Sequence, residues 1–173
     1  EFLKKHADLA GALEISTGNC FREFAEKETL LGRKAKEILD AGRRQPDWFA
    51  FAIWLSSFGD LVQGEEILLA SGSPRSLREA GLEDEALEFT LRPKAIAIYI
   101  EVSREEVKKR LLLRARGDDN DKEINRKMEW FEADVLPVVE YYRKEQRLIT
   151  VGGEQSPEEV FRELERKLKE YFK

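Results

Sequence analysis

The sequence predicts an α/β protein in which helices flank a parallel sheet. Residues 67–70 form an unbroken apolar run, which is typical of a strand buried on both faces. Residues 94–102 are rich in isoleucine and have the pattern of a second strand. Segments with helical periodicity separate the strands, and such an alternation favours a parallel sheet with right-handed crossovers.

The bulk composition predicts one globular domain over residues 1–173. The chain has 173 residues, of which 42% are hydrophobic and 38% charged, and a formal net charge of −5. That acidic balance weighs against a nucleic-acid partner, although a small phosphorylated ligand needs only a local cluster of cations. One cysteine and one histidine exclude an internal disulfide framework and a Cys/His metal site. The longest apolar stretch, residues 49–55, is too short to span a bilayer, so we expect a cytoplasmic protein with no membrane partner.

The first half of the chain is expected to form a helix tail at residues 1–10, a short strand at 13–15 and then helices. Residues 19–28 and 30–41 have helical patterns, and Gly42 lies at the C-cap of the second. Asp47 is the expected N-cap of a very apolar helix over residues 48–62. Aromatic residues cover much of that helix, so we expect them to pack in the core rather than to stack on a base.

The second half alternates in the same way. A turn-rich loop, residues 71–75, follows the first buried strand. A capping box at Ser103 begins a helix that ends near residue 114, and a charged break follows at residues 116–119. Residues 121–145 form a long helix with a kink expected at Pro137. The last strand covers residues 148–151, and a second capping box at Ser156 begins the final helix.

Three polar or glycine-bearing loops directly follow predicted strands. They are residues 16–18, 71–75 and 152–153. The carboxyl ends of parallel strands lie at one edge of a sheet, and ligands of open α/β sheets bind there. We therefore expect the functional site at this edge.

Arginines near these loops point to phosphoryl chemistry. Arg22 and Arg75 lie just beyond two strands, Arg110 and Arg114 share one helix face, and Arg116 begins the charged break. Guanidinium groups pair bidentately with phosphate oxygens and stay charged. Phosphoryl transfer needs mainly positioning and neutralisation of charge. Spacing alone favours the plainer alternative of solvated arginines in a charged protein, and only the order of the motifs reverses that preference.

Short motifs follow one another in a specific order from about residue 13 to the C-terminus. They are Ile15-Ser16-Thr17-Gly18 with Arg22, Leu31-Gly32, Ala41-Gly42, Pro46-Asp47, Gly72-Ser73-Pro74-Arg75, Arg110 with Arg114, Arg116-Gly117-Asp118-Asp119-Asn120, Pro137 with Tyr141-Tyr142, and Val151-Gly152-Gly153. The ordered set resembles the adenylate kinase family of nucleoside monophosphate kinases. The resemblance implies a P-loop kinase fold and reversible phosphoryl transfer from MgATP to AMP or another nucleoside monophosphate. It also implies that Mg²⁺ is carried with ATP.

The resemblance further implies roles for single residues. On the acceptor side, Thr17, Gly18 and the backbone near Gln45 line the base, Arg22 and Arg75 with Gly72 hold the phosphate, and Glu79 faces the base edge. On the donor side, Arg110 and the backbone near Gln155 lie against adenine, Arg114, Arg116 and Lys127 neutralise the phosphates in transfer, and Asp118 and Asp119 hold the closing arginines. The same resemblance implies a monophosphate-binding helical insertion at residues 16–60, a short lid at residues 114–121 without zinc cysteines, and a monomer.

The start of the chain departs from this pattern. The family begins with a strand and a glycine-rich phosphate loop, and no segment of residues 1–173 matches G-x-x-x-x-G-K-[ST]. That strand lies in the middle of the family's sheet, so we expect a gap there and interpret the sequence as lacking its natural beginning. A nucleotide-binding relic that cannot transfer phosphate is the alternative. A plain helical interaction protein is a third hypothesis, and the buried-strand patterns argue against it.

Substitutions within the motifs are the other departures. Asn19 and Ser71 are neutral where the family has acidic residues that hold water on magnesium. Lys127 replaces an arginine, and lysine cannot make a bidentate contact. Glu79 replaces a glutamine that reads adenine. A carboxylate only accepts hydrogen bonds, which suits guanine, so we expect an acceptor preference shifted away from strict AMP.

Overall fold

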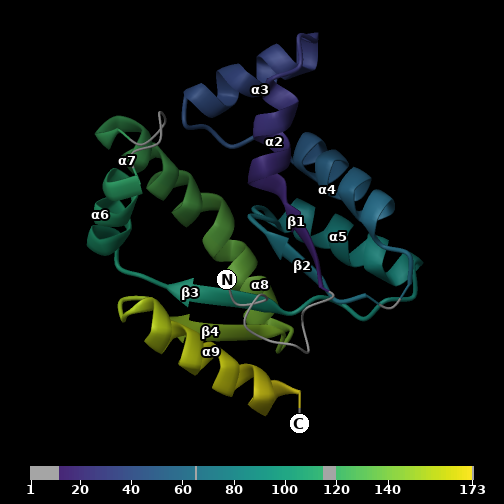
Figure 1. The fold of residues 1–173 in the computed structure, drawn as a ribbon, viewed down its shortest axis with the longest axis vertical. Coiled ribbons are helices and arrows are strands. Elements are labelled where there is room, and N and C mark those ends of the chain that lie inside the picture. The colour runs from purple at the N-terminus through teal and green to yellow at the C-terminus, as the bar shows by residue number, and fades with distance from the viewer. Residues whose placement is uncertain (1–11, 65, 115–119, 173) are drawn as a thin grey trace.

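The computed structural model describes residues 12–64, 66–114 and 120–172. The helix tail expected at residues 1–10 and the charged break at residues 116–119 lie outside these residues. Strands in the described part form two parallel pairs (Figure 1). They are β1 (Leu13–Ser16) with β2 (Leu68–Ser71), and β3 (Ala97–Glu101) with β4 (Leu148–Gly152). The predicted α/β class and the parallel strand direction are confirmed.

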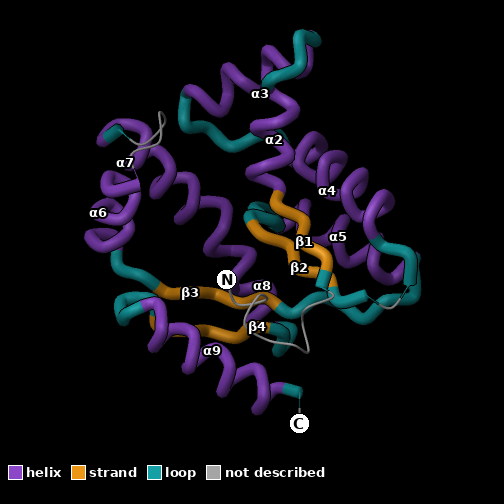
Figure 2. The backbone as a smooth tube through the Cα atoms, viewed as in Figure 1, coloured by secondary structure: helices purple, strands orange, loops and turns teal. Residues whose placement is uncertain are grey.

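The sheet is divided between the two pairs. Among the described residues, β2 is paired only with β1 and β3 only with β4. The division is consistent with the expected gap in the middle of the sheet, and the strand expected to fill that gap stays a prediction. Helices surround both pairs (Figure 2), and α9 (Pro157–Tyr171) packs on β4.

Three helices follow β1, namely α2 (Thr17–Ala25), α3 (Leu30–Asp40) and α4 (Asp47–Leu61). The aromatic residues of α4 mostly pack inside, as predicted. Trp54 and Phe58 lie in one buried cluster, and Phe49 lies in another. Trp48 is the exception, with 54% of its surface exposed. The predicted cap was wrong by one residue, because α4 begins at Asp47 and Pro46 holds the N-cap position.

Helix α5 (Leu77–Phe89) was not predicted from the sequence. Its N-cap is Ser76, whose hydroxyl accepts a hydrogen bond from the Glu79 amide. The inward face of α5 carries the buried acidic residues Glu79, Glu83 and Asp84. An amphipathic helix normally places apolar residues on that face, so the periodicity does not reveal this one.

The long helix predicted over residues 121–145 is interrupted before its proline. It consists of α7 (Asp121–Trp130), a π-helical segment η2 (Phe131–Val135) and α8 (Leu136–Lys144). Pro137 has no N–H to donate, and its ring crowds the carbonyl one turn earlier. A wider π turn relieves both problems, so the expected kink takes this form.

The remaining predicted helices are confirmed. Helix α6 spans Arg104–Arg114, and α9 begins with a complete capping box formed by Ser156 and Glu159. None of the helices in the described ranges combines the length and the apolar character needed to cross a membrane.

Contacts between α5 and α8 join the two halves of the molecule. Ala80, Val138 and Tyr142 form a buried apolar cluster. Beside it, the Arg147 Nη2 lies 2.6 Å from the Asp84 Oδ2, and both residues are buried. Removal of one partner from such a pair leaves an uncompensated charge, which commonly destabilises a protein by about 3–5 kcal/mol. The two strand pairs are therefore held in a fixed relation.

Candidate active site

The adjacent ends of β1 and β2 carry the first group of predicted site residues. Ser16 and Ser71 are opposite each other in the parallel ladder. The next residue, Thr17, is buried, and its hydroxyl donates to the Gly72 carbonyl at 2.9 Å. This bond fixes the start of α2 against the loop that follows β2.

Gly72 is the point at which this loop turns. Its φ is +77°, a conformation that residues with a Cβ rarely adopt. A Cβ at this position would lie 2.8 Å from the Arg75 Nη2 and 3.1 Å from the Thr17 Oγ1. The glycine thus allows the Arg75 side chain to fold back over the loop, where its Nε donates to the Gly72 carbonyl at 2.6 Å.

Two guanidinium groups converge on this edge of the sheet. Arg22 lies in the second turn of α2, and a Cβ on Gly18 would lie 3.6 Å from the Arg22 Nη1. The Arg75 guanidinium lies over the ring of Trp130, 5.6 Å from its centroid. Burial holds the pKa of Arg75 below its ordinary value, and the positive charges of Arg44 and Arg22 act in the same direction against the opposing effect of Glu79. An anion bound between the arginines would relieve this repulsion.

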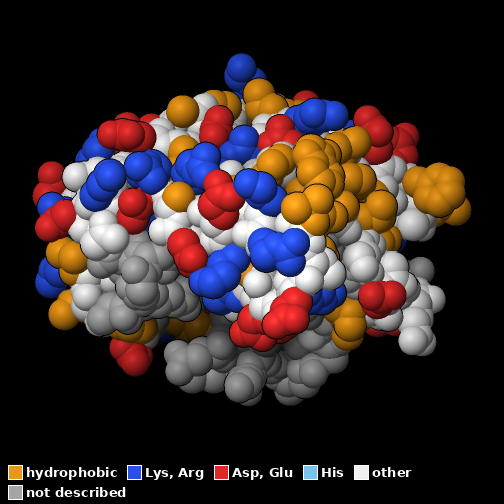
Figure 3. All heavy atoms as spheres, turned by 90° about the horizontal axis from the view of Figure 1, so that it is seen from above, with side chains coloured by type: hydrophobic (Ala, Val, Ile, Leu, Met, Phe, Trp, Pro, Cys, Tyr) orange, Lys and Arg blue, Asp and Glu red, His pale blue; other side chains and the backbone are white. Residues whose placement is uncertain are grey.

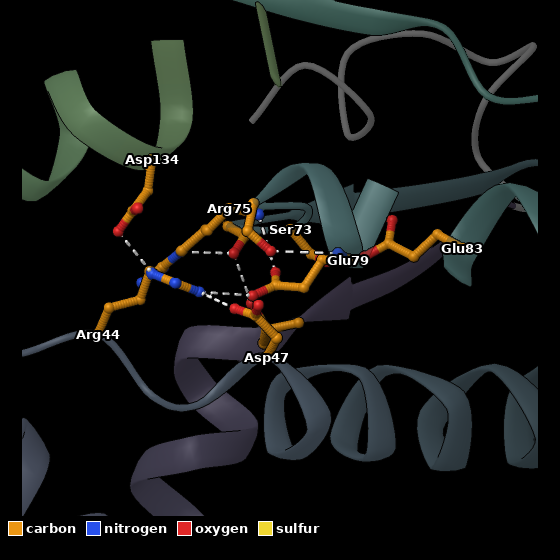
Figure 4. A network of polar contacts seen from close by, with 10 residues as sticks. Arg44, Asp47, Ser73, Arg75, Glu79, Glu83 and Asp134 are labelled. Carbon is orange, nitrogen blue, oxygen red and sulfur yellow. Dashed lines mark hydrogen bonds and ion pairs between the residues drawn. The ribbon is translucent and has the colours of Figure 1, made fainter. Parts of the chain in front are cut away.

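Glu79 and Arg44 form a network beside these two arginines (Figure 4). The Glu79 side chain is buried, its Oε2 accepts the Arg75 backbone N–H at 2.8 Å, and its Oε1 accepts from the Arg44 Nη1 at 3.0 Å. Burial raises the pKa of Glu79, and these two contacts oppose the increase. The carboxylate that the sequence assigned to the base edge is therefore already bound on both oxygens.

Arg44 also contacts two further carboxylates. Its Nε donates to the Asp134 Oδ2 at 3.0 Å, and its Nη1 donates to Asp47. Burial lowers the pKa of Arg44, but the contacts with Asp47 and Asp134 outweigh burial and the pKa is raised. The sequence analysis did not select Arg44, Asp134 or Trp130. Contacts between segments far apart in the chain reveal them, and the only sequence signal was that Arg44 precedes Gln45.

Gln45 lies beside the network, but its side chain points elsewhere. The residue is buried, and its Nε2 donates to the Ala35 carbonyl at 2.9 Å. The expected role of its backbone beside the base stays a prediction. The nearby Gly42 has a φ of +59°, and a Cβ on it would lie 2.5 Å from the Glu123 Oε2 of α7.

A second group of predicted residues lies at the ends of β3 and β4. Arg110 of α6 and Gln155, which follows β4, line one cavity of about 490 Å³ together with Gly153 and apolar residues of α9. The Arg110 Nε donates to Glu106 at 2.8 Å, and Gln155 donates to Glu163 at 3.3 Å. Arg110 and Gln155 thus line the same cavity, and their contact with a donor adenine stays a prediction.

One face of the molecule has mixed charge. On the face seen in Figure 3, acidic and basic side chains alternate beside an area of hydrophobic side chains.

Comparison with known proteins identifies the family of this chain. The family model described as adenylate kinase matches residues 3–147. This chain belongs to the adenylate kinase family. Adenylate kinase 1 of Nostoc sp. (strain PCC 7120) is 31% identical over 150 residues, which cover 87% of this chain and 81% of that protein. The adenylate kinase of Azobacteroides pseudotrichonymphae is 31% identical over 163 residues, which cover 92% and 85%, respectively.

The remaining predicted residues of this adenylate kinase family member are only partly described. Arg114 is the last residue of α6, and Lys127 lies on α7. Arg116, Asp118 and Asp119 lie outside the described residues.

The described residues do not form a metal site of their own. They contain no group of His, Cys, Asp and Glu side chains that could hold an ion. The Asn19 side-chain Oδ1 accepts a hydrogen bond from the Arg22 Nη2, and Ser71 adds no charge. The residues present therefore do not fit a protein-held magnesium ion.

Proposed function

We propose that this protein reversibly transfers a phosphoryl group from MgATP to AMP or another nucleoside monophosphate. The observation that carries the proposal is the convergence of Arg22 and Arg75 on the loop that follows β2, in a chain of the adenylate kinase family. Two guanidinium groups that converge on one loop are a preformed site for one phosphate.

On the acceptor side, Arg22 and Arg75 hold the phosphate of the monophosphate. The base lies against Thr17, Gly18 and the backbone of Gln45, within a helical insertion at residues 16–60. The Thr17–Gly72 hydrogen bond fixes these elements before the substrate arrives. Such preorganisation places the acceptor oxygen for attack without a covalent intermediate.

On the donor side, Arg110 and the backbone near Gln155 lie against the adenine of ATP. Arg114, Arg116 and Lys127 neutralise the charge of the group in transfer, while Asp118 and Asp119 hold the closing arginines. Residues 114–121 act as a short lid that excludes water from the phosphates. Magnesium travels with the phosphates of ATP, whose oxygens it prefers, and no step needs a protein carboxylate to hold it.

A second candidate function is the binding of a monophosphate without transfer. Asn19 and Ser71 favour it, because neither supplies the negative charge that orients water on magnesium.

Incubation of the full chain with MgATP and each of AMP, GMP, CMP and UMP tests the proposal. Chromatography should detect ADP together with the diphosphate of at least one acceptor, and Arg75→Met should suppress both products. Binding of a monophosphate without any diphosphate would support the second candidate instead. If the chain neither binds a monophosphate nor forms a diphosphate, both candidate functions are excluded.

A further inference from the structure

Arg44 holds its guanidinium in one orientation with three carboxylates from three elements. Asp47 begins α4, Glu79 lies in α5 and Asp134 lies in η2. Figure 4 shows Arg44 between Asp134 and the Asp47–Glu79 pair. The Arg44 side chain is 19% exposed, so it is accessible despite these contacts. A long side chain fixed in this way loses little further entropy when it binds a ligand.

The contacts of Arg44 leave part of its guanidinium unused. The Nε and Nη1 atoms make all of its hydrogen bonds to described residues, and Nη2 makes none of them. Nη2 carries two N–H groups and has no acceptor capacity. A ligand group that contacts the Arg44 Nη2 must therefore be a hydrogen-bond acceptor.

Glu79 cannot read a base without first losing a partner. Both of its oxygens are bound, one to the Arg75 amide and one to Arg44, and the residue is only 1% exposed. The recognition group that this part of the site offers is consequently the donor group of Arg44.

We propose that Arg44 selects the acceptor base and favours a 6-oxopurine monophosphate over AMP. The inference rests on the proposed function, which sets the base beside Gln45, the chain neighbour of Arg44. The ion-pair partner of Arg44 is Glu79, the residue that the family resemblance places at the base edge. Guanine presents O6 and N7, both acceptors, whereas adenine presents its 6-amino donor next to N7. A guanidinium therefore meets an acceptor on a 6-oxopurine and a competing donor on adenine.

Inosine monophosphate (IMP) is the matched probe, because it differs from AMP by an oxo group in place of the 6-amino group and by the proton on N1. Calorimetric titration of the full chain with IMP, AMP and ribose 5-phosphate gives three dissociation constants. We expect IMP to bind about tenfold more tightly than AMP, the factor typical of one well-placed base contact. Ribose 5-phosphate has no base and reports on the phosphate contacts alone.

The variant for this test removes both charges of the ion pair. Arg44→Met alone leaves the Glu79 carboxylate buried without a cation, which endangers folding. The double variant Arg44→Met with Glu79→Gln carries no charge at either position and leaves the net charge of the chain unchanged. It also keeps a side-chain oxygen that can accept the Arg75 amide. We expect its ratio of AMP to IMP dissociation constants to fall to about one, whereas Glu79→Gln alone, which keeps Arg44, should retain the preference for IMP.

The outcomes separate this inference from the proposed function. AMP binding as tightly as IMP in the unmodified chain overturns the inference alone, as does an unchanged ratio in the double variant. An equal loss of affinity for all three ligands in the double variant shows that Arg44 only positions Arg75, and also overturns it. Failure of all three ligands to bind the unmodified chain overturns the proposed function and the inference with it.

Discussion

At the scale of single residues, buried charge distinguishes this site from an ordinary core. Glu83 is 4% exposed and accepts a hydrogen bond from Ser73, but no described residue forms an ion pair with it. Burial raises the pKa of Glu83 to about 8, with Glu79 and Asp84 acting in the same direction. The carboxyl group lies beneath the loop that carries Arg75, so its protonation affects the framework of the site.

The raised pKa of Glu83 predicts a pH-dependent stability. Between its ordinary pKa of 4.5 and about 8, the unfolded chain releases a proton that the folded protein keeps. The free energy of unfolding therefore falls as pH rises through this window, by up to about 1.4 kcal/mol per pH unit. Glu83→Gln removes the effect, so urea denaturation should show a gain in stability that is small at pH 5 and large at pH 8.

Glu85→Gln is the matched control, because Glu85 is an exposed residue of the same helix. It should change stability little at either pH. A gain from Glu83→Gln of equal size at pH 5 and pH 8 would contradict the assignment of a buried, protonated Glu83.

Arg44 shows why single residues of the site escaped the sequence analysis. It follows Arg43 in a polar stretch, and nothing local distinguishes the two. Its partners Glu79 and Asp134 lie 35 and 90 residues away in the chain. Arg22 and Arg75 were selected because they lie just beyond two strands and because the order of the motifs resembles the family, and Thr17 was selected through that resemblance.

At the scale of elements, the sequence predicts those whose signals are local. The capping box of α9 and the apolar runs of β2 and β3 were located to within a few residues. Helix α5 was missed because its inner face is acidic rather than apolar. The π-helical segment was missed because only the whole long helix shows where the wide turn falls.

The loop after β2 depends on one glycine for its shape. Gly72→Ala would place a Cβ at a φ of +77°, 2.8 Å from the Arg75 Nη2. We expect a loss of stability of about 1–2 kcal/mol, together with weaker monophosphate binding because Arg75 must move. Thermal denaturation and calorimetric titration measure the two effects.

Gly59 provides the opposite case for comparison. It lies within α4, and a Cβ there meets nothing within 4 Å. Gly59→Ala should therefore stabilise the protein by about 0.5–1 kcal/mol, the helix propensity difference. Destabilisation of similar size by both substitutions would refute the special role of Gly72.

At the scale of the whole molecule, the site depends on elements from distant parts of the sequence. Arg22 comes from α2, Arg75 from the loop before α5, and Trp130 from the end of α7. The buried contacts of α5 with α8 hold these elements in position between the two strand pairs. The family resemblance predicts the pairing of Arg22 with Arg75, whereas the position of Trp130 and the contacts of the Arg44 network follow only from the folded structure.

The central claim is that Arg22 and Arg75 together bind the phosphate of a nucleoside monophosphate. Its most direct test is calorimetric titration of AMP and IMP into the unmodified chain, Arg75→Met and Arg166→Met. Arg166 is exposed on α9, so its substitution changes net charge equally. We predict that Arg75→Met weakens the binding of both nucleotides about 10- to 100-fold, as expected for lost charged hydrogen bonds. We predict that Arg166→Met leaves both dissociation constants unchanged. Equal affinities in all three proteins would contradict the claim.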